Sequence, residues 1–243
     1  EDSARDAADT LLRRAPLRGR IGEPQSAVSD IDGAAKIYHR LDNTVGLAKC
    51  YLQAGELLDS MDRRTDAAEE YRQAAAIAAT WKNDSRASYF YFRHACKLVE
   101  LREYVDAERI FKFLASADWL ERELKLTVIS QLCLVAQATG NDKELKERCS
   151  LALVMIDELI QEAVSAEERR SLLIKKGQHL EQFGQHDQAL QCFKKAIERF
   201  DVISDQEGII ECWFHIRGVM QHLGDHEKER EASEKVLALG AEK

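Results

Sequence analysis

The sequence has few of the residues that interrupt regular structure. It contains 2 prolines and 12 glycines among 243 residues. Hydrophobic residues make up 45% of the chain and charged residues 32%. This mixture favours a folded, almost wholly helical protein over a sheet protein or a disordered chain.

Long apolar runs are also missing. No run approaches the roughly 20 residues that a membrane-spanning helix needs, and the N-terminal stretch lacks the apolar core of a signal peptide. We therefore expect a soluble, cytoplasmic protein with no membrane partner. The net charge of −8 disfavours a nucleic-acid partner, because phosphates favour a basic face. Since the chain begins with Glu rather than Met, we expect a processed chain or a fragment attached to further domains of a longer protein.

Motifs for catalysis and for cofactors are absent. The sequence has no G-x-x-x-x-G-K-[ST], G-x-G-x-x-G, G-x-S-x-G or H-E-x-x-H, so we predict no catalytic residue, no enzymatic activity and no cofactor. Glu211, His215 and His222 have spacings that place them near one helix face. A turn separates His222 from His226, and we therefore prefer a solvated or partner-facing polar surface to a zinc site.

The cysteines form no C-x-x-C pair. Cys133 and Cys149 fall where the helical pattern requires small buried residues, so we interpret the thiols as small apolar side chains in a reducing compartment. Metal and redox roles are the minor alternatives. The six residues are Cys50, Cys96, Cys133, Cys149, Cys192 and Cys212.

Residues 170–200 show most clearly what the chain does contain. Apolar and small residues recur there at three- and four-residue spacing on both sides of a polar turn at Gly184, which predicts two amphipathic helices. Gly177 and Ala189 are small where two antiparallel helices come closest, and Phe193 fills the space beside them. Such a pair cannot bury its own apolar faces, so it requires neighbours.

The order of these residues, a small residue, Gly before the turn and then Ala-x3-Phe-x2-Ala, resembles the tetratricopeptide repeat. Related positions recur at steps of 33, 40, 38, 44 and 40 residues, and all but the first exceed the usual period of about 34. The longer period resembles the variety found in bacterial signalling and sensor proteins. The recurring positions are Ala34, Ala67, Ala107, Leu145, Ala189 and Glu229.

The resemblance implies an all-α fold, a right-handed α-solenoid of antiparallel helix pairs with about 12 helices in one array. The pairs expected are a degenerate N-terminal pair in residues 1–43, repeats in residues 44–80, 85–115, 119–162 and 166–200, and a terminal capping repeat in residues 204–243.

Local signals refine these boundaries. Pro16, Gly19, Gly22 and Pro24 predict that a short helix of residues 3–14 is followed by a loop or a broken helix end. Junctions of one kind precede later helices at residues 41–48, 82–87 and 204–208, where Asp or Ser can cap the next helix. The segment Ser165-Ala166-Glu167-Glu168 predicts a capping box.

Four consecutive aromatic residues stand in the first helix of the third pair, at residues 89–92. Consecutive side chains point to all sides of a helix, so the four rings cannot all face one core. We expect at least one of them to reach the concave surface or a neighbouring repeat.

In tetratricopeptide arrays the first helix of each pair lines a concave groove. Transferred by position, the resemblance implies that the groove contains Lys49, Gln53, Tyr89, Phe92, Arg93, Ser130, Gln131, Lys175, Gln178 and His215. The aromatic residues offer flat apolar contacts, the cations attract carboxylates, and the amides can bond an extended backbone. An ordinary solvated helix face is the alternative for each residue.

The Lys-and-Asn carboxylate clamp of chaperone-binding members is missing from this groove. Leu52 and Glu56 stand at the corresponding positions of one repeat, and Phe92 and Cys96 at those of the next. A chaperone co-factor role is therefore disfavoured.

The leading functional hypothesis is a non-enzymatic scaffold that binds a protein or peptide partner in the concave groove. The alternative is an effector-sensing segment of a larger signalling protein, such as a nucleotide-switched ATPase or a transcription regulator. No residue pattern identifies the partner.

Overall fold

The structure, a computed structural model, describes residues 2–81, 85–198 and 206–240. These residues form twelve α-helices and no strand, which confirms the all-α prediction. In chain order the helices are α1 Asp2–Arg20, α2 Pro24–Arg40, α3 Thr44–Ser60, α4 Arg64–Ala78, α5 Ser85–Glu100, α6 Tyr104–Ser116, α7 Arg122–Ala138, α8 Asp142–Glu162, α9 Ala166–Gln182, α10 His186–Ile197, α11 Gln206–Leu223 and α12 His226–Gly240.

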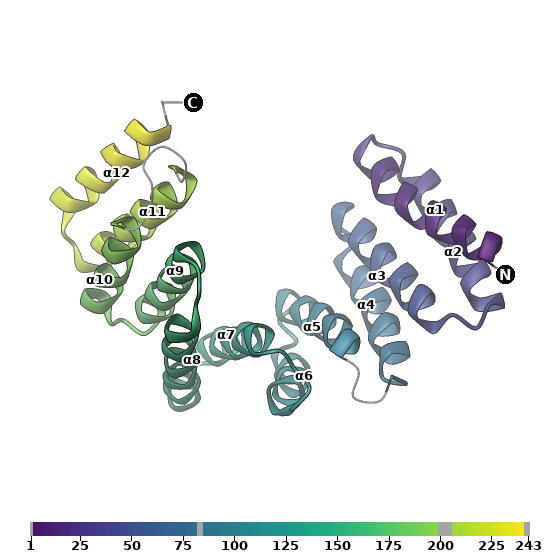
Figure 1. Ribbon diagram of the computed structural model, residues 1–243, viewed down its shortest axis with the longest axis horizontal. Coiled ribbons are helices and arrows are strands. Elements are labelled where there is room, and N and C mark those ends of the chain that lie inside the picture. Colours follow the sequence, from purple (N-terminus) through teal and green to yellow (C-terminus); the bar gives the residue numbers. More distant parts are fainter. Residues whose placement is uncertain (1, 82–84, 199–205, 241–243) are drawn as a thin grey trace. The chain divides into compact units, whose positions relative to one another are not determined.

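The helices belong to two compact units, Glu1–Gly140 and Asn141–Lys243. The first unit contains three neighbouring helix pairs, α1/α2, α3/α4 and α5/α6, followed by α7 (Figure 1). The second unit contains α8 and the pairs α9/α10 and α11/α12. We call the odd-numbered helices A helices and the even-numbered ones B helices. The single continuous array expected from the repeats stays a prediction.

One residue in the left-handed backbone region lies in every turn from an A helix to the following B helix. Four of these residues are glycines, as at Gly184 with φ of +70°, and the other two are Asp62 and Arg102. The left-handed residue allows the N–H of the following residue to donate a hydrogen bond to the end of the preceding A helix. The Gln185 N–H, for example, donates to the carbonyl of Leu180 at 2.9 Å. The chain can therefore reverse in about three residues.

The prediction for the N-terminus was wrong. Helix α1 continues to Arg20 with the exposed Pro16 inside it, and the turn comes only at Gly22. Pro24 then occupies the first turn of α2, where its missing N–H costs nothing. Tertiary contacts explain the longer helix, because one stripe of α1 is buried up to the residue before Pro16, and beyond the proline Arg18 pairs with Asp30 of α2 at 3.0 Å. The stripe consists of Ala8, Leu12 and Ala15.

The predicted helix starts agree with the structure where it describes them. The Ser165 hydroxyl accepts a hydrogen bond from the Glu168 N–H at 3.0 Å, and the Glu168 carboxylate accepts one from the Val164 N–H at 3.1 Å rather than from Ser165. At the first junction Asn43 caps α3 by accepting from the Gly46 N–H at 2.9 Å. Residues 82–84 and 204–205 of the other two junctions lie outside the described residues.

Close approach of A and B helices depends on glycines that face aromatic rings. A Cβ atom on Gly177 would lie 2.5 Å from the Phe193 ring, and one on Gly55 would lie 2.8 Å from the Tyr71 ring. Real Cβ atoms do not approach other atoms so closely, so any larger residue forces the helices apart. Phe193 and Tyr71 are themselves almost fully buried.

The four consecutive aromatic residues of α5 point in different directions, as expected. Three of them pack against other rings: Phe90 at 5.5 Å from Trp81, Tyr91 at 5.4 Å from Phe113, and Phe92 at 5.9 Å from Phe111. Tyr89 remains 47% exposed. Only this ring is left largely available to a partner.

A buried ion cluster, which the sequence pattern did not reveal, joins α1 to α2. The Asp30 side chain, 4% exposed, accepts two hydrogen bonds from Arg14 at 2.7 and 2.6 Å and one from Arg18 at 3.0 Å. The hydrogen bonds from Arg14 lower the pKa of Asp30 and outweigh its burial, which acts in the opposite direction.

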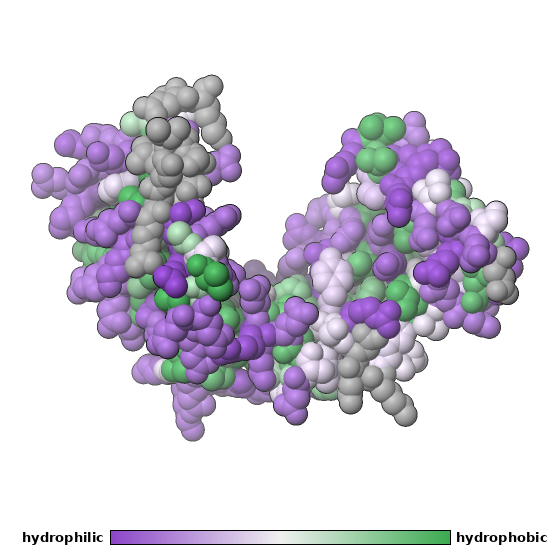
Figure 2. Space-filling view, in the orientation of Figure 1, coloured by the Kyte–Doolittle hydropathy of each residue, from purple (hydrophilic) through white to green (hydrophobic). Residues whose placement is uncertain are grey.

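Hydrophilic residues cover much of the visible face of each unit, with hydrophobic residues showing between them (Figure 2). Within the described residues, none of the helices combines the length and the hydrophobicity required to cross a membrane.

Replacing Gly177 by Ala should lower the free energy of unfolding by about 1–3 kcal/mol, and replacing it by Leu should lower it further, because the ring of Phe193 cannot move away. Urea unfolding measures the change. Gly218→Ala is the matched control, since its Cβ would meet only a side-chain oxygen of Glu181 at 3.3 Å. If Gly177→Ala lowers the free energy of unfolding by the same amount in a Phe193→Leu background, the contact with the Phe193 ring is not the cause.

Asp30→Asn should lower the free energy of unfolding by about 1–3 kcal/mol at neutral pH. Because the folded pKa of Asp30 is lowered, its stabilisation is present above the unfolded pKa of about 3.9 and disappears as the pH falls through the folded value. Wild type and Asp30→Asn should therefore converge in stability in strong acid. Urea titrations across that pH range test this; a difference that stays constant would contradict it.

Native thiols should react slowly with a thiol reagent, because five of the six are buried and the reactive thiolate is disfavoured. Burial raises the pKa of Cys96 to about 11 and that of Cys50 to about 12. Cys96, which is only half-buried, should react first, and Cys96→Ser should remove the fastest phase of the labelling reaction. Mass spectrometry of labelled peptides identifies the sites. Rapid native labelling of Cys133 or Cys149 would contradict their burial.

Candidate functional site

In the first unit, ion pairs link neighbouring A helices across the face on which the groove is expected. From α5, Arg93 lies 3.4 Å from the Glu56 carboxylate of α3, and Lys97 lies 2.7 Å from Asp59 of α3. Lys97 also pairs with Glu100 of its own helix. These contacts hold the A helices of consecutive pairs side by side.

Tyr71 of α4 lies at the centre of this network. Its hydroxyl donates to Asp59 at 2.9 Å and accepts from Arg93 at 2.9 Å, while the Arg93 guanidinium lies 5.2 Å from its ring centroid. Burial and then the hydrogen bond to Asp59 raise the pKa of Tyr71. The phenol therefore remains protonated and acts as a structural link between α3, α4 and α5.

The charge of Lys97 is also structural. Burial alone would lower its pKa, but the hydrogen bonds to Asp59 and Glu100 leave the pKa raised. Lys97 therefore remains a cation and is not prepared to act as a nucleophile or a base.

The predicted groove residues of this unit differ in how available they are. Tyr89 and Lys49 are exposed, Gln131 is half-buried, and Arg93 keeps part of its guanidinium accessible beside Tyr71. Phe92 packs against another ring and offers less surface to a partner.

Two polar residues of the predicted groove have distinct surroundings. Gln53 borders a cavity of about 180 Å³ between α1 and α3, and its buried Oε1 accepts no hydrogen bond from any residue that the structure describes. The Ser130 hydroxyl donates to the Leu126 carbonyl of its own helix at 2.9 Å. The Gln53 oxygen can therefore accept a hydrogen bond from a ligand, whereas the Ser130 hydroxyl already donates its hydrogen to Leu126.

In the second unit, α9 and α11 bring Gln178 and His215 together at 3.0 Å. The His215 ring stacks on Phe193 at 5.1 Å and lies 3.4 Å from the carboxylate of Glu181. Lys175 is exposed on α9. The pair Gln178–His215 is a polar link between A helices, as Arg93–Glu56 is in the first unit.

The histidines considered for a zinc site take other partners. His222 stacks on His186 at 5.9 Å, and Glu211 is exposed. Among the described residues, Glu211, His215 and His222 do not form one group of ligands.

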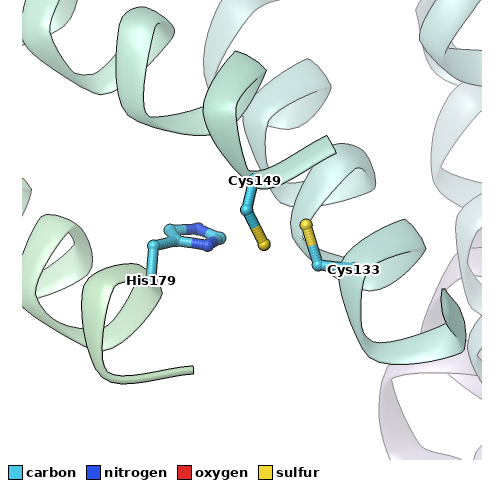
Figure 3. A group of neighbouring side chains, drawn as sticks. All are labelled: Cys133, Cys149 and His179. Atoms are coloured by element: carbon cyan, nitrogen blue, oxygen red, sulfur yellow. The ribbon is translucent and has the colours of Figure 1, made fainter. Parts of the chain in front are cut away.

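His179 is a buried histidine that the sequence analysis did not single out. Its ring and the Cys149 thiol offer atoms within 4.8 Å of each other (Figure 3). Burial lowers the pKa of His179, which keeps the imidazole neutral at physiological pH. Cys149 is fully buried, in agreement with its predicted core position.

The network around Tyr71 was likewise not predicted from the sequence. A signal was present, because α3 carries carboxylates at positions 56 and 59 and α5 carries cations at positions 93 and 97. The two carboxylates are three residues apart and the two cations four residues apart, so each pair lies on one face of its helix. Within the described residues, this face carries aromatic, cationic and amide groups.

Comparison with known proteins agrees with this architecture. Residues 1–135 match the family model "Soluble NSF attachment protein, SNAP", and residues 171–200 match a tetratricopeptide repeat model. No curated protein sequence gives a significant match.

Several solved structures have a similar fold. A kinesin light chain from Podospora anserina with nearly identical TPR-like repeats is 15% identical, with a TM-score of 0.62, covering 82% of this chain and 96% of that one. Pseudomonas aeruginosa PilF is 17% identical, with a TM-score of 0.59, covering 99% and 100%. A Rap protein complexed with competence and sporulation factor is 13% identical, with a TM-score of 0.58, covering 100% and 66%.

At these low sequence identities, the structural similarity shows a shared fold of tetratricopeptide-like helix pairs and nothing further. The family model covers more than half of the sequence and includes the three helix pairs of the first unit. The chain therefore belongs to the soluble NSF attachment protein family and is a helical-repeat scaffold.

Proposed function

We propose that this scaffold is a non-enzymatic binding protein that takes a peptide or a partner helix on the face formed by its A helices. We place it in the cytoplasm, as its composition and reduced cysteines suggest. The groove residues predicted from the sequence supply the contacts in each unit.

The observation that carries the proposal is the exposure of Tyr89. Its three aromatic neighbours in α5 pack against other rings, whereas Tyr89 remains 47% exposed on the A-helix face. Aromatic and Arg side chains supply much of the binding energy at protein interfaces, and Arg93 lies one turn further along the same helix.

Polar groups beside these residues support a peptide ligand. Gln53 has a buried oxygen that lacks a hydrogen-bond donor, and Gln131 is half-buried in α7. In the second unit the exposed cation of Lys175 can attract a carboxylate, and Gln178 can bond a peptide backbone. These are the group types that hold an extended segment.

The comparisons are compatible with a binding role. The family name describes attachment to another protein, and the Rap protein of similar fold was solved in complex with a factor. We extend to this chain only the general role of protein or peptide binding.

Random peptides displayed on phage and selected on the full chain test this proposal. Selected peptides are then measured by fluorescence polarisation against single variants. Tyr89→Ala should weaken binding about tenfold or more, which corresponds to about 1.4 kcal/mol. Lys175→Glu should weaken the binding of acidic peptides and reduce its salt dependence.

Each variant has a matched control on a B helix. Phe113 of α6 is 50% exposed, much like Tyr89, and Lys195 of α10 is exposed, like Lys175. Phe113→Ala and Lys195→Glu should leave binding almost unchanged. If the A-helix and B-helix variants lose affinity equally, or if the selected peptides bind all of them as tightly as the wild-type chain, the binding surface lies elsewhere.

A further inference from the structure

The B-helix side of the first unit carries a separate groove of about 490 Å³, outside the proposed A-helix site. Its floor is α3 and its walls are α2 and α4, which both pack on α3. Apolar side chains line the floor at the spacing of one helix face. They are Cys50, Tyr51, Ala54, Leu57 and Leu58.

This floor is not fully covered by the walls. Tyr51, Ala54 and Leu58 are half-buried, and Val28 on the α2 wall is 42% exposed. The partly uncovered stripe from Tyr51 to Leu58 is about 10 Å long at the helical rise of 1.5 Å per residue. It thus offers about two turns of apolar surface to another helix.

Carboxylates line the walls of the same groove. Asp66 pairs with Arg63 at 2.6 Å, and Glu69 pairs with Arg72 at 2.6 Å. Asp32 of α2 and Glu70 of α4 also line it, and neither makes an ion pair with any other described residue. The groove therefore has two carboxylates whose charge its own surroundings leave uncompensated.

Of these two carboxylates, Glu70 has the less favourable electrostatic surroundings. It is half-buried, and burial together with the nearby charges of Glu69, Asp32 and Asp66 raises its pKa. A cation brought into the groove would relieve this repulsion, because opposite charges attract more strongly where water is partly excluded.

We propose that this groove binds a basic amphipathic helix of a partner protein, with the apolar face of that helix on the α3 stripe and a Lys or Arg at Asp32 and Glu70. A straight apolar floor between two helical walls suits a helix better than an extended strand. A second copy of this chain fits less well, because its net charge of −8 repeats the charge of the groove.

The probe is a fluorescent amphipathic peptide of Leu and Lys, about 18 residues or five helical turns long. Its binding to the full chain is measured by fluorescence polarisation, beside a peptide in which Glu replaces every Lys. The Lys peptide should bind the wild-type chain at least about tenfold more tightly than the Glu peptide.

The variant Asp32→Lys with Glu70→Lys should weaken the Lys peptide about tenfold or more and strengthen the Glu peptide. Asp118→Lys with Glu231→Lys changes the net charge equally at exposed positions outside the groove, and it should have little effect. Val28→Ser should weaken the Lys peptide through the apolar contact alone.

Should the double Lys variant fail to fold, the neutral pair Asp32→Asn with Glu70→Gln gives the same comparison, checked by circular dichroism. Equal loss in the groove and control variants would show a non-specific charge effect and overturn the proposal. A wild-type dimer in sedimentation that dissociates on Asp32→Lys would assign the groove to a second copy and overturn it as well.

Discussion

The close approach of an A helix to its B helix, which glycines allow in α3/α4 and α9/α10, is the constraint on which the neighbouring features depend. At Gly177 and Gly55 a helix backbone rests directly on an aromatic ring, and no side chain larger than hydrogen fits between them. The ring fixes both the distance and the rotation of the two helices, because rigid aromatic groups fill such gaps in one way. The faces that each pair presents to its neighbours follow from that rotation.

Tyr71 shows how this packing also organises polar groups. Its ring occupies the space beside Gly55, which directs its hydroxyl to the place where α3 and α5 meet. Asp59 and Arg93 bond to that hydroxyl, and their neighbours Glu56 and Lys97 complete the network. A single core residue thus connects helix packing with the charged surface of the A helices. In the second unit His215, stacked on Phe193, holds a comparable position.

The two sides of the first unit differ in surface chemistry for the same reason. On the A-helix side, side chains from successive A helices reach each other, so the surface is polar with one exposed ring at Tyr89. On the B-helix side, α2 and α4 leave the apolar stripe of α3 partly uncovered between acidic walls. A helical repeat can in this way present two surfaces that suit ligands of different chemistry.

The sequence by itself determined the helix pairs, because the three- and four-residue spacing of apolar residues, the glycines of the turns and the cap at Ser165 are all local signals. It also indicated the contact of Gly177 with Phe193. Only the tertiary structure decided that α1 continues past Pro16, that Asp30 and Lys97 are buried with partners, and which of four adjacent aromatic residues stays exposed. Those outcomes depend on residues distant in sequence, whose packing and charge outweigh local propensity.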